Sequence, residues 1–545
     1  MKQKQENIEV QAHPRILRSV SVVSFMTAIS RVLGLVREIA MAYFFGTTAL
    51  KSAFDIAFII PNLFRRLFGE GALSSAFVPV FSETLEKEGR EQAFKLAVRV
   101  ISLLILVLGV ITLLGILLTF PLAEILSSES RWQVPLPLLR VMLPYAVLIC
   151  VAALISGMLN TFGKFGISSL TPFLLNLIWI FTLVISAPFL KGSLVAQIKI
   201  LCWAILSAGL AQILFQLPAL ARQGFRFRLA FSGLGQDRAL RRVLILMGPA
   251  ALGIGLIQIN VCVDKFLAFW ADAAAPAALE YAERIVYLPL GMFGTAFMTV
   301  LLPAFSRQAA RGDYNMMRAT LERAIRNLAV IMAPCSSALI VLALPIVMLI
   351  YHFKGGRFDQ LSGLLSARAL MAYAPGLFVF SLQKAVMPAF YGLQDLRTPV
   401  RVSLFGLGLN IVLNVASVLL LPDGWKHVGI AGSTVFTSLV NGVTLAWILH
   451  KRIGAPRAAV LFKPVLKAVF CATVMAGVVW VAHGFGCTLM RGCDLNIKIA
   501  NVLVMIVTIA AGGVSYAGLM FLISRQELME MAGELWHRRQ LERGA

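Results

Sequence analysis

Residues 30–83 read SRVLGLVREIAMAYFFGTTALKSAFDIAFIIPNLFRRLFGEGALSSAFVPVFSE. The stretch is apolar enough to enter a lipid bilayer, yet its apolar runs carry the arginines Arg31, Arg37, Arg65 and Arg66. An arginine at the centre of a membrane costs roughly 2.5 to 3.5 kcal/mol on insertion scales, and such residues usually face a water-filled cavity. The stretch therefore predicts membrane-spanning helices whose arginines line a cavity that attracts anions.

The composition of the whole chain indicates the same class of protein. Of its 545 residues, 59% are hydrophobic and only 14% are charged, and the mean hydropathy is +0.84. Apolar runs of about 17 residues or more recur along the sequence, and each is long enough to cross the bilayer as a helix. The sequence predicts an all-α polytopic membrane protein without a large soluble domain.

The net charge of +23 does not predict nucleic-acid binding, because the basic residues are spread between apolar segments. Many of them crowd into two connections, one near residues 222–242 and one near residues 307–326. The connections near residues 120–138 and 271–280 are poor in lysine and arginine. Under the positive-inside rule, the arginine-rich connections are expected to be cytoplasmic.

Breaks at glycine, proline and charge clusters predict about fourteen transmembrane helices. They are expected to begin near residues 17, 53, 95, 137, 170, 196, 240, 276, 321, 366, 399, 427, 463 and 496. An even number of spans places both termini on one side of the membrane. The basic residues at both ends make that side the cytoplasm.

An internal repeat divides these spans. The segment FVPVFSETLEKEGREQAFKLA from Phe77 recurs as LLPAFSRQAARGDYNMMRATL from Leu301, an offset of about 225 residues. This predicts two six-helix lobes related by a pseudo-two-fold axis along the membrane normal, plus two extra C-terminal helices. The predicted parts are a cytoplasmic tail (1–16), a first lobe (17–228), a second lobe (229–452), spans thirteen and fourteen (453–524) and a second cytoplasmic tail (525–545).

Four segments resemble a known family. They are SRVLGLVRE from Ser30, PNLFRRLFGEGALSSAFVPVFSE from Pro61, YAERIVYLPLGMFGTAFMTVLLPAFSR from Tyr281 and FYGLQDLRTP from Phe390. They resemble the MurJ (MviN) family of lipid II flippases, part of the larger group of multidrug and oligosaccharide-lipid exporters. The resemblance implies export of lipid II, the undecaprenyl diphosphate disaccharide-pentapeptide, from the inner to the outer leaflet of the bacterial cytoplasmic membrane. The expected protein is a monomeric transporter that works by alternating access and is not an enzyme.

The expected substrate-binding residues are Arg31, Arg37, Arg65 and Arg284. Arginine suits a diphosphate because its planar fork donates paired hydrogen bonds to phosphate oxygens and stays charged when desolvated. The family pattern is what favours Arg65 over its neighbour and marks Arg284. The accessory charges expected around the cavity are Glu38, Asp55, Arg66, Glu70 and Glu283.

Several of these charges have a purely structural alternative. At 100° per residue, Arg31, Gly34 and Glu38 share one helix face, whereas Arg37 points elsewhere unless Gly34 bends the helix. Either arginine could pair with Glu38. Arg284 follows Glu280 by four residues, so that pair could be a structural ion pair.

A second constellation, Asp264, Asn410, Asn414 and Thr434, offers oxygen ligands for a monovalent cation such as Na⁺. Asn410 and Asn414 are one helical turn apart in an otherwise apolar span. The alternative is interhelical hydrogen bonding, which is common for polar residues in membrane bundles. No other cofactor is expected.

The sequence has no GxxxxGK[ST] phosphate loop and no CxxC or HExxH motif, so an ATP-driven or zinc-dependent reaction is not predicted. The alternative function is export of another polyprenyl-diphosphate oligosaccharide, or multidrug antiport by the same fold. Small residues in spans thirteen and fourteen predict a groove for the lipid tail, although they also allow close helix packing. Whether Cys487 and Cys493 form a disulfide stays open.

Overall fold

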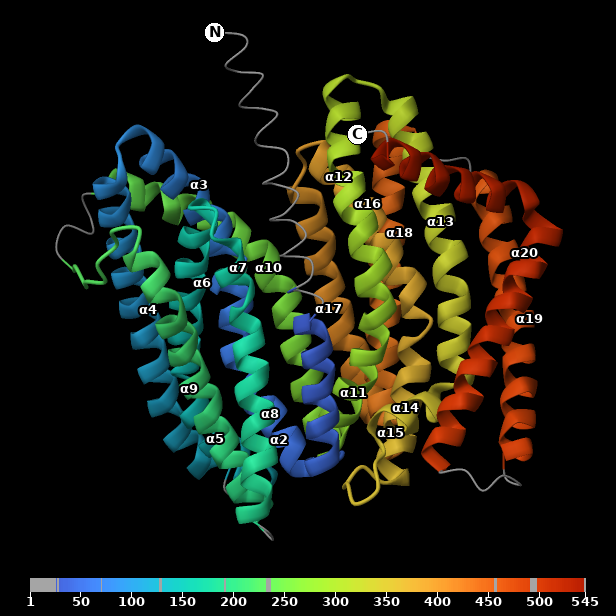
Figure 1. Ribbon diagram of the computed structural model, residues 1–545, viewed down its shortest axis with the longest axis horizontal. Helices are drawn as coiled ribbons and strands as arrows, with labels where there is room; N and C mark the ends of the chain where they lie inside the picture. The colour runs from blue at the N-terminus through green and yellow to red at the C-terminus, as the bar shows by residue number, and fades with distance from the viewer. Residues whose placement is uncertain are drawn as a thin grey trace. The chain divides into compact units, whose positions relative to one another are not determined.

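The computed structural model describes residue 26 and residues 29–69, 71–126, 130–190, 193–231, 237–454, 458–490 and 497–543. Every regular element among these residues is helical. By their contacts they fall into two compact units, Met1–Phe269 with Gly355–Arg357, and Trp270–Lys354 with Phe358–Ala545. Within each unit the long helices run roughly alongside one another (Figure 1).

The first unit begins with a helix over residues 29–45. It is followed by α2 (Ala49–Phe64), η1 (Arg65–Gly69), α3 (Ala72–Lys87), α4 (Arg90–Ile125), η2 (Ser130–Trp132), α5 (Pro135–Met142), α6 (Tyr145–Thr161), α7 (Phe165–Ser169), α8 (Thr171–Phe189), α9 (Leu194–Ala221) and α10 (Arg238–Ala271). Its apolar core gathers buried aromatic side chains such as Phe54, Phe77 and Tyr145.

The second unit contains α11 (Ala275–Pro289), η3 (Leu290–Gly294), α12 (Thr295–Ala310), α13 (Tyr314–Val341), α14 (Ala343–Tyr351), α15 (Gln360–Tyr373), α16 (Gly376–Gly392), α17 (Arg397–Leu420), α18 (Lys426–Ile453), α19 (Ala458–Met490) and α20 (Ile497–Arg543). Apolar side chains of α13, α19 and α20 pack together in a cluster that includes Val330, Cys471 and Met520. The backbone of α20 leaves helical geometry at Ser524, just before the predicted C-terminal tail.

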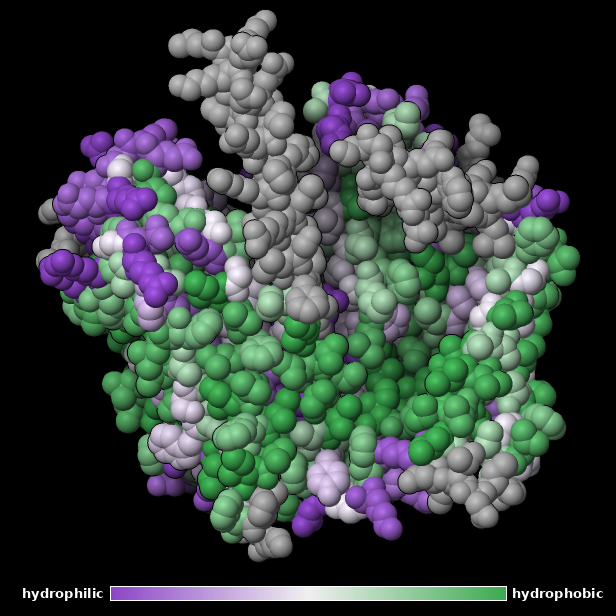
Figure 2. Space-filling view, in the orientation of Figure 1, coloured by the Kyte–Doolittle hydropathy of each residue, from purple (hydrophilic) through white to green (hydrophobic). Residues whose placement is uncertain are grey.

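The protein is a multi-pass membrane protein. Among the described residues, ten helices are long and apolar enough to cross a bilayer, or eleven if the bent pair α15 and α16 forms one span. Each of the ten begins within two turns of a predicted start. The predicted total of fourteen is compatible with this number, which covers the described residues alone. Figure 2 shows the apolar side chains as a band across the helices of each unit, with hydrophilic residues toward the helix ends.

The order of elements reproduces the sequence repeat. A π-helical segment, η1, separates α2 from α3, and a second, η3, separates α11 from α12. The two segments lie at the same offset as the repeat in the sequence. A π-helical turn inserts an extra residue per turn, and such turns are frequent at functional sites. Each repeat therefore interrupts its second span at the corresponding position.

An ion pair joins the start of α10 to α4 of the first unit, with which α10 groups although its sequence begins the second repeat. Asp237 accepts hydrogen bonds from the backbone N–H groups of Ala239 and Leu240 at 2.8 and 3.1 Å. Arg99 of α4 donates to the same carboxylate. Burial alone would raise the pKa of Asp237, but these hydrogen bonds lower it overall. The predicted lobe boundary at residues 228/229 follows the repeat and stays a prediction.

A second carboxylate, Asp395, holds the connection between α16 and α17. It accepts hydrogen bonds from the backbone and hydroxyl of Thr398 and from Arg452 at the end of α18. The preceding residue, Gln394, has a φ of 59°, a conformation that the connection must stabilise for a residue other than glycine. Asp395 therefore ties three helices together at one end of the unit.

Acid is expected to weaken this connection. Burial raises the pKa of Asp395, but Thr398 and Arg452 lower it overall, below its ordinary value. Its contribution to stability is thus complete above the unfolded pKa of about 3.9 and is lost as the pH falls through the lower folded pKa. Asp395→Asn should lower the melting temperature at pH 7, and the difference from wild type should shrink below about pH 4. Melting curves between pH 3 and pH 7 measure this, and a difference that is independent of pH would contradict it.

Candidate functional site

Arg37 is held by three partners within the first unit. Its Nη1 donates to Asn176 Oδ1 at 3.2 Å, and its Nη2 donates to Glu38 Oε1 at 2.6 Å. Its guanidinium carbon lies 4.5 Å from the ring centroid of Trp179. Glu38, Asn176 and Trp179 are all buried. The structure therefore confirms the pairing of an arginine with Glu38 that the sequence left open, and identifies it as Arg37.

Asn176 also contacts the part of this helix that precedes Arg37. Asn176 of α8 donates to the carbonyl of Ser30 and lies 4.0 Å from the position of a Cβ added at Gly34. Gly34 and Arg37 therefore both meet Asn176, and the long arginine side chain reaches this partner from one turn further along the helix. Arg31 is exposed and makes no ion pair with the described residues.

Asp55 forms an ion pair with Lys51 inside α2. Lys51 Nζ lies 2.5 and 2.7 Å from the two carboxylate oxygens, and the side chains are 2% and 8% exposed. The predicted accessory charge is therefore neutralised by a partner that the sequence analysis missed. The signal was present, because Lys51 precedes Asp55 by four residues, which places the two on one helix face.

The π-helical segment η1 begins with Arg65 and Arg66. Arg65 Nε donates to Asn62 Oδ1 at 2.9 Å, and Arg66 Nη1 donates to Gln258 Oε1 of α10 at 3.1 Å. Both acceptors are neutral amides, and these two hydrogen bonds orient the arginines. Glu70, the predicted neutralising acid, lies outside the described residues.

In the second unit, Arg284 of α11 lies one turn after Glu280, with Nη2 at 3.3 Å from Oε1. The arginine side chain is 36% exposed and that of Glu280 is 19% exposed. Glu283 lies beside Arg284 in sequence and is half-buried. The structural pair with Glu280 thus exists, but its partial exposure leaves the guanidinium accessible.

The predicted sodium ligands are divided between the two units. Asn410 and Asn414 of α17 are fully buried, and Asn414 Nδ2 donates to Asn410 Oδ1 at 2.8 Å. The hydroxyl of Thr434 in α18 donates to Ile430 of its own helix at 3.1 Å. Asp264 lies on α10 in the other unit, where it is 8% exposed. In the part of the chain that the structure describes, no group of three or more His, Cys, Asp or Glu side chains is placed to hold a metal ion.

The asparagine pair continues a polar seam between α17 and α18. Ser417 and Ser433 hydroxyl oxygens are 3.2 Å apart, and a Cβ added at Gly406 would lie 2.3 Å from Asn441 Nδ2. The seam therefore brings the two helices close together, as interhelical polar contacts do in membranes. The bond between Asn410 and Asn414 lies within α17, so the interhelical alternative for this pair stays a prediction.

The relatives of this chain decide its family. The model of the family described as lipid II flippase MurJ matches residues 41–490. A lipid II flippase MurJ of Burkholderia cenocepacia is 33% identical over 508 residues, which is 91% of this chain and 96% of the relative. The chain belongs to the MurJ family of lipid II flippases. A probable lipid II flippase MurJ of Vibrio cholerae is also 33% identical, over 81% of this chain and 84% of the relative.

Solved structures agree on the fold. A lipid II flippase MurJ in an inward closed conformation matches with a TM-score of 0.75 at 22% identity, over 93% of this chain and 99% of that one. An inward-facing multidrug transporter of the MATE family matches with a TM-score of 0.65 at 16% identity, over 81% and 98%. The MurJ family membership and these neighbours confirm the fold class predicted from the sequence.

Proposed function

We propose that this chain exports lipid II from the inner to the outer leaflet of the bacterial cytoplasmic membrane. The observation that carries the proposal is the MurJ family match over residues 41–490, which includes Arg65, Arg66 and Arg284. Lipid II is the named cargo of the relatives. The arginines in the apolar spans can donate charge-assisted hydrogen bonds to an anionic headgroup.

The diphosphate is the part of the substrate that these arginines bind in this proposal. Arg31 is exposed and Arg284 is partly exposed, so both can reach a ligand. Arg65 and Arg66 are oriented by hydrogen bonds to the neutral amides of Asn62 and Gln258. Arg37, which pairs with Glu38 and donates to Asn176, is the fourth arginine of the proposed site.

Alternating access is the proposed mechanism. The π-helical segments η1 and η3 interrupt the second span of each repeat, and such interruptions are natural bending points. Bending at η1, which carries Arg65 and Arg66, and at η3, which follows the Arg284-bearing helix α11, would move these arginines relative to the rest of their own repeats. Both termini are proposed to lie in the cytoplasm, and the working unit is proposed to be a monomer.

Complementation tests the proposal. A bacterium depleted of its own lipid II flippase should grow when this chain is expressed, and the Arg284→Ala variant should not support growth. The rival function is export of another polyprenyl-diphosphate oligosaccharide or multidrug antiport. Absence of growth with wild-type protein present in the membrane, together with drug efflux or export of another lipid-linked oligosaccharide, would favour the rival.

A sodium ion is the proposed coupling cation, with Asp264, Asn410, Asn414 and Thr434 as its oxygen ligands. The Oδ1 of the buried Asn410 accepts one hydrogen bond, from Asn414 at 2.8 Å, and an amide oxygen has a second lone pair that supports its proposal as a ligand. We expect Asn410→Leu to remove any dependence of transport on sodium. Transport measured with sodium against potassium or choline tests this, and equal rates for the wild type in all three would contradict the site.

The lipid tail is proposed to run along α19 and α20. A Cβ added at Gly477 or Gly513 would meet no atom within 4 Å, so both positions border open space. Gly512, by contrast, packs on α19, since a Cβ there would lie 2.6 Å from Val479 Cγ2. The two kinds of glycine allow a test that separates a lost tail path from a lost fold.

We expect Gly477→Leu with Gly513→Leu to impair lipid II transport without lowering the melting temperature. A tail-less headgroup analogue should bind this variant as it binds the wild type. Gly512→Leu is the matched control, and it should lower the melting temperature because the added side chain displaces Val479. Normal transport by the Gly477 and Gly513 variant would exclude the tail path.

A further inference from the structure

A cavity lies at the turn between α12 and α13, apart from the arginines assigned to transport. Its volume is about 310 Å³, and it is lined by Ala304, Arg307, Gln308, Arg311, Asp313 and Met316. Both helices belong to spans long and apolar enough to cross the membrane, and the cavity sits where the two spans end. It is therefore at the level of the membrane surface, on the side that the arginine-rich connection predicts to be cytoplasmic.

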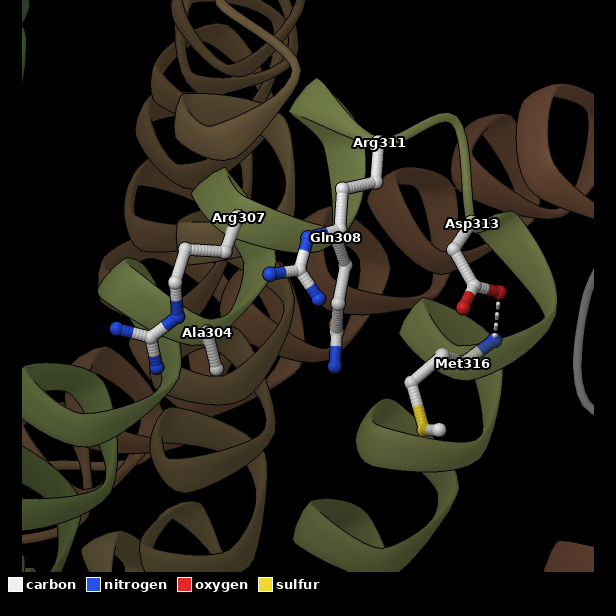
Figure 3. Close-up of a pocket in the computed structure, with 6 residues that line it drawn as sticks. All are labelled: Ala304, Arg307, Gln308, Arg311, Asp313 and Met316. Atoms are coloured by element: carbon white, nitrogen blue, oxygen red, sulfur yellow. Dashed lines mark hydrogen bonds between the residues drawn. The ribbon is translucent and has the colours of Figure 1, made fainter.

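The cavity carries an excess of positive charge. Arg307 and Arg311 are one turn apart on α12, and like charges at this spacing repel each other. Neither makes an ion pair with the residues that the structure describes. Asp313 caps α13 by accepting the backbone N–H of Met316 at 2.9 Å. Figure 3 shows Arg307, Gln308 and Arg311 projecting from α12, with Asp313 and Met316 on the α13 side. Two guanidinium groups against one carboxylate favour an anion.

Gln308 adds a requirement for a hydrogen-bond donor. Its Nε2 donates to Thr320 Oγ1 at 2.9 Å, which fixes the amide. Its Oε1 is buried and accepts no hydrogen bond from the described residues. A buried acceptor without a donor is unfavourable. A ligand that carries a hydroxyl beside its anionic group would satisfy both the arginines and this oxygen.

The surroundings favour a lipid as the source of that ligand. Tyr314 and Met316 are 45% and 51% exposed beside the cavity, and tyrosine is enriched where a membrane meets water. The cytoplasmic leaflet carries anionic lipids, which attract basic segments next to membrane spans. The volume is at the lower end of the roughly 300 to 1,000 Å³ of small-molecule sites, which suits a headgroup.

We propose that this cavity binds the headgroup of an anionic, hydroxyl-bearing phospholipid such as phosphatidylglycerol. The phosphate lies between Arg307 and Arg311, and a glycerol hydroxyl donates to Gln308 Oε1. The bound lipid would hold the α12–α13 turn at the membrane surface. This site does not depend on the proposed transport of lipid II.

Lipid titration of the purified full chain in detergent, followed by native mass spectrometry, tests the arginines. The Arg307→Gln/Arg311→Gln variant should bind phosphatidylglycerol at least about tenfold more weakly than wild type, since charge-assisted hydrogen bonds are lost. The matched control is Arg226→Gln/Arg228→Gln, which removes the same charge from two exposed arginines on another connection. Its affinity should equal that of wild type. Equal losses in both variants, or no loss in the first, would overturn the proposal.

Phosphatidylmethanol has the same charge as phosphatidylglycerol but no hydroxyl, so it tests Gln308. Wild type should bind phosphatidylglycerol severalfold more tightly than phosphatidylmethanol, and Gln308→Leu should make the two affinities equal. Equal binding of the two lipids by wild type would overturn the assignment of the hydroxyl to Gln308. Soluble glycerol phosphate should not displace the lipid. Displacement at matched concentrations would assign the cavity to a free phosphate ester and overturn the lipid assignment.

Discussion

Alanine in place of Lys51 is expected to destabilise the first unit strongly. The substitution removes the ammonium group that lies 2.5 and 2.7 Å from the buried Asp55 carboxylate oxygens, and breaking a buried ion pair costs about 3 to 5 kcal/mol. The Lys51→Ala variant should therefore melt well below wild type in detergent. Replacing both residues, as in Lys51→Met with Asp55→Leu, should restore most of the loss, because no buried charge remains.

The exposed pair of Lys95 with Glu91 on α4 provides the matched control. Its side chains are 51% and 82% exposed and have the same spacing of four residues. Such a surface pair contributes only about 0.3 to 0.5 kcal/mol. The Lys95→Ala variant should therefore have the same melting temperature as wild type. Equal melting temperatures for Lys51→Ala and Lys95→Ala would show that the pair in α2 is not buried in the membrane protein.

The second large effect is expected at the arginines. Arg31→Ala and Arg284→Ala should each abolish complementation while the protein stays in the membrane at near-normal levels. Each lost charge-assisted hydrogen bond contributes about 1.5 to 3 kcal/mol, or roughly tenfold to a hundredfold in affinity for the diphosphate. Lysine at these positions should rescue growth only in part, because it lacks the planar fork.

Arg37 requires a different design, because its loss also removes the guanidinium that lies 2.6 Å from the buried carboxylate of Glu38. Arg37→Ala alone is expected to reduce protein levels as well as transport. The double variant Arg37→Ala/Glu38→Gln removes both charges and should recover the protein level. If Arg37 contributes its charge to the site, growth should remain absent in the double variant. Growth of the double variant would assign Arg37 a purely structural role.

Much of the fold could be predicted because it depends on local composition. Apolar runs located the spans, and the recurrence of the Phe77 segment at Leu301 anticipated the repeated order of helices. The pairing of Arg284 with Glu280 followed from helical spacing alone. The same rule applied to Lys51 would have predicted its pair with Asp55.

The remaining features depend on contacts between segments far apart in the chain. Asn176 and Trp179 of α8 contact Arg37, which lies 139 residues before Asn176 in the sequence. No periodicity in either segment predicts that the two helices meet. Gln258 reaches Arg66 from α10, which groups with the first unit because of contacts such as Asp237 with Arg99. The π-helical turns depend on packing that forces an extra residue into a helix, and the sequence carries no simple signal for them.

The most direct test of lipid II export measures the substrate at the outer leaflet. Cells depleted of their own flippase are supplied with this chain, and lipid II accessible from outside is assayed with an enzyme or toxin that cannot cross the membrane. We predict accessibility near the level of undepleted cells with wild-type protein and background accessibility with Arg284→Ala at equal protein level. Background accessibility with wild-type protein correctly inserted in the membrane would contradict the account.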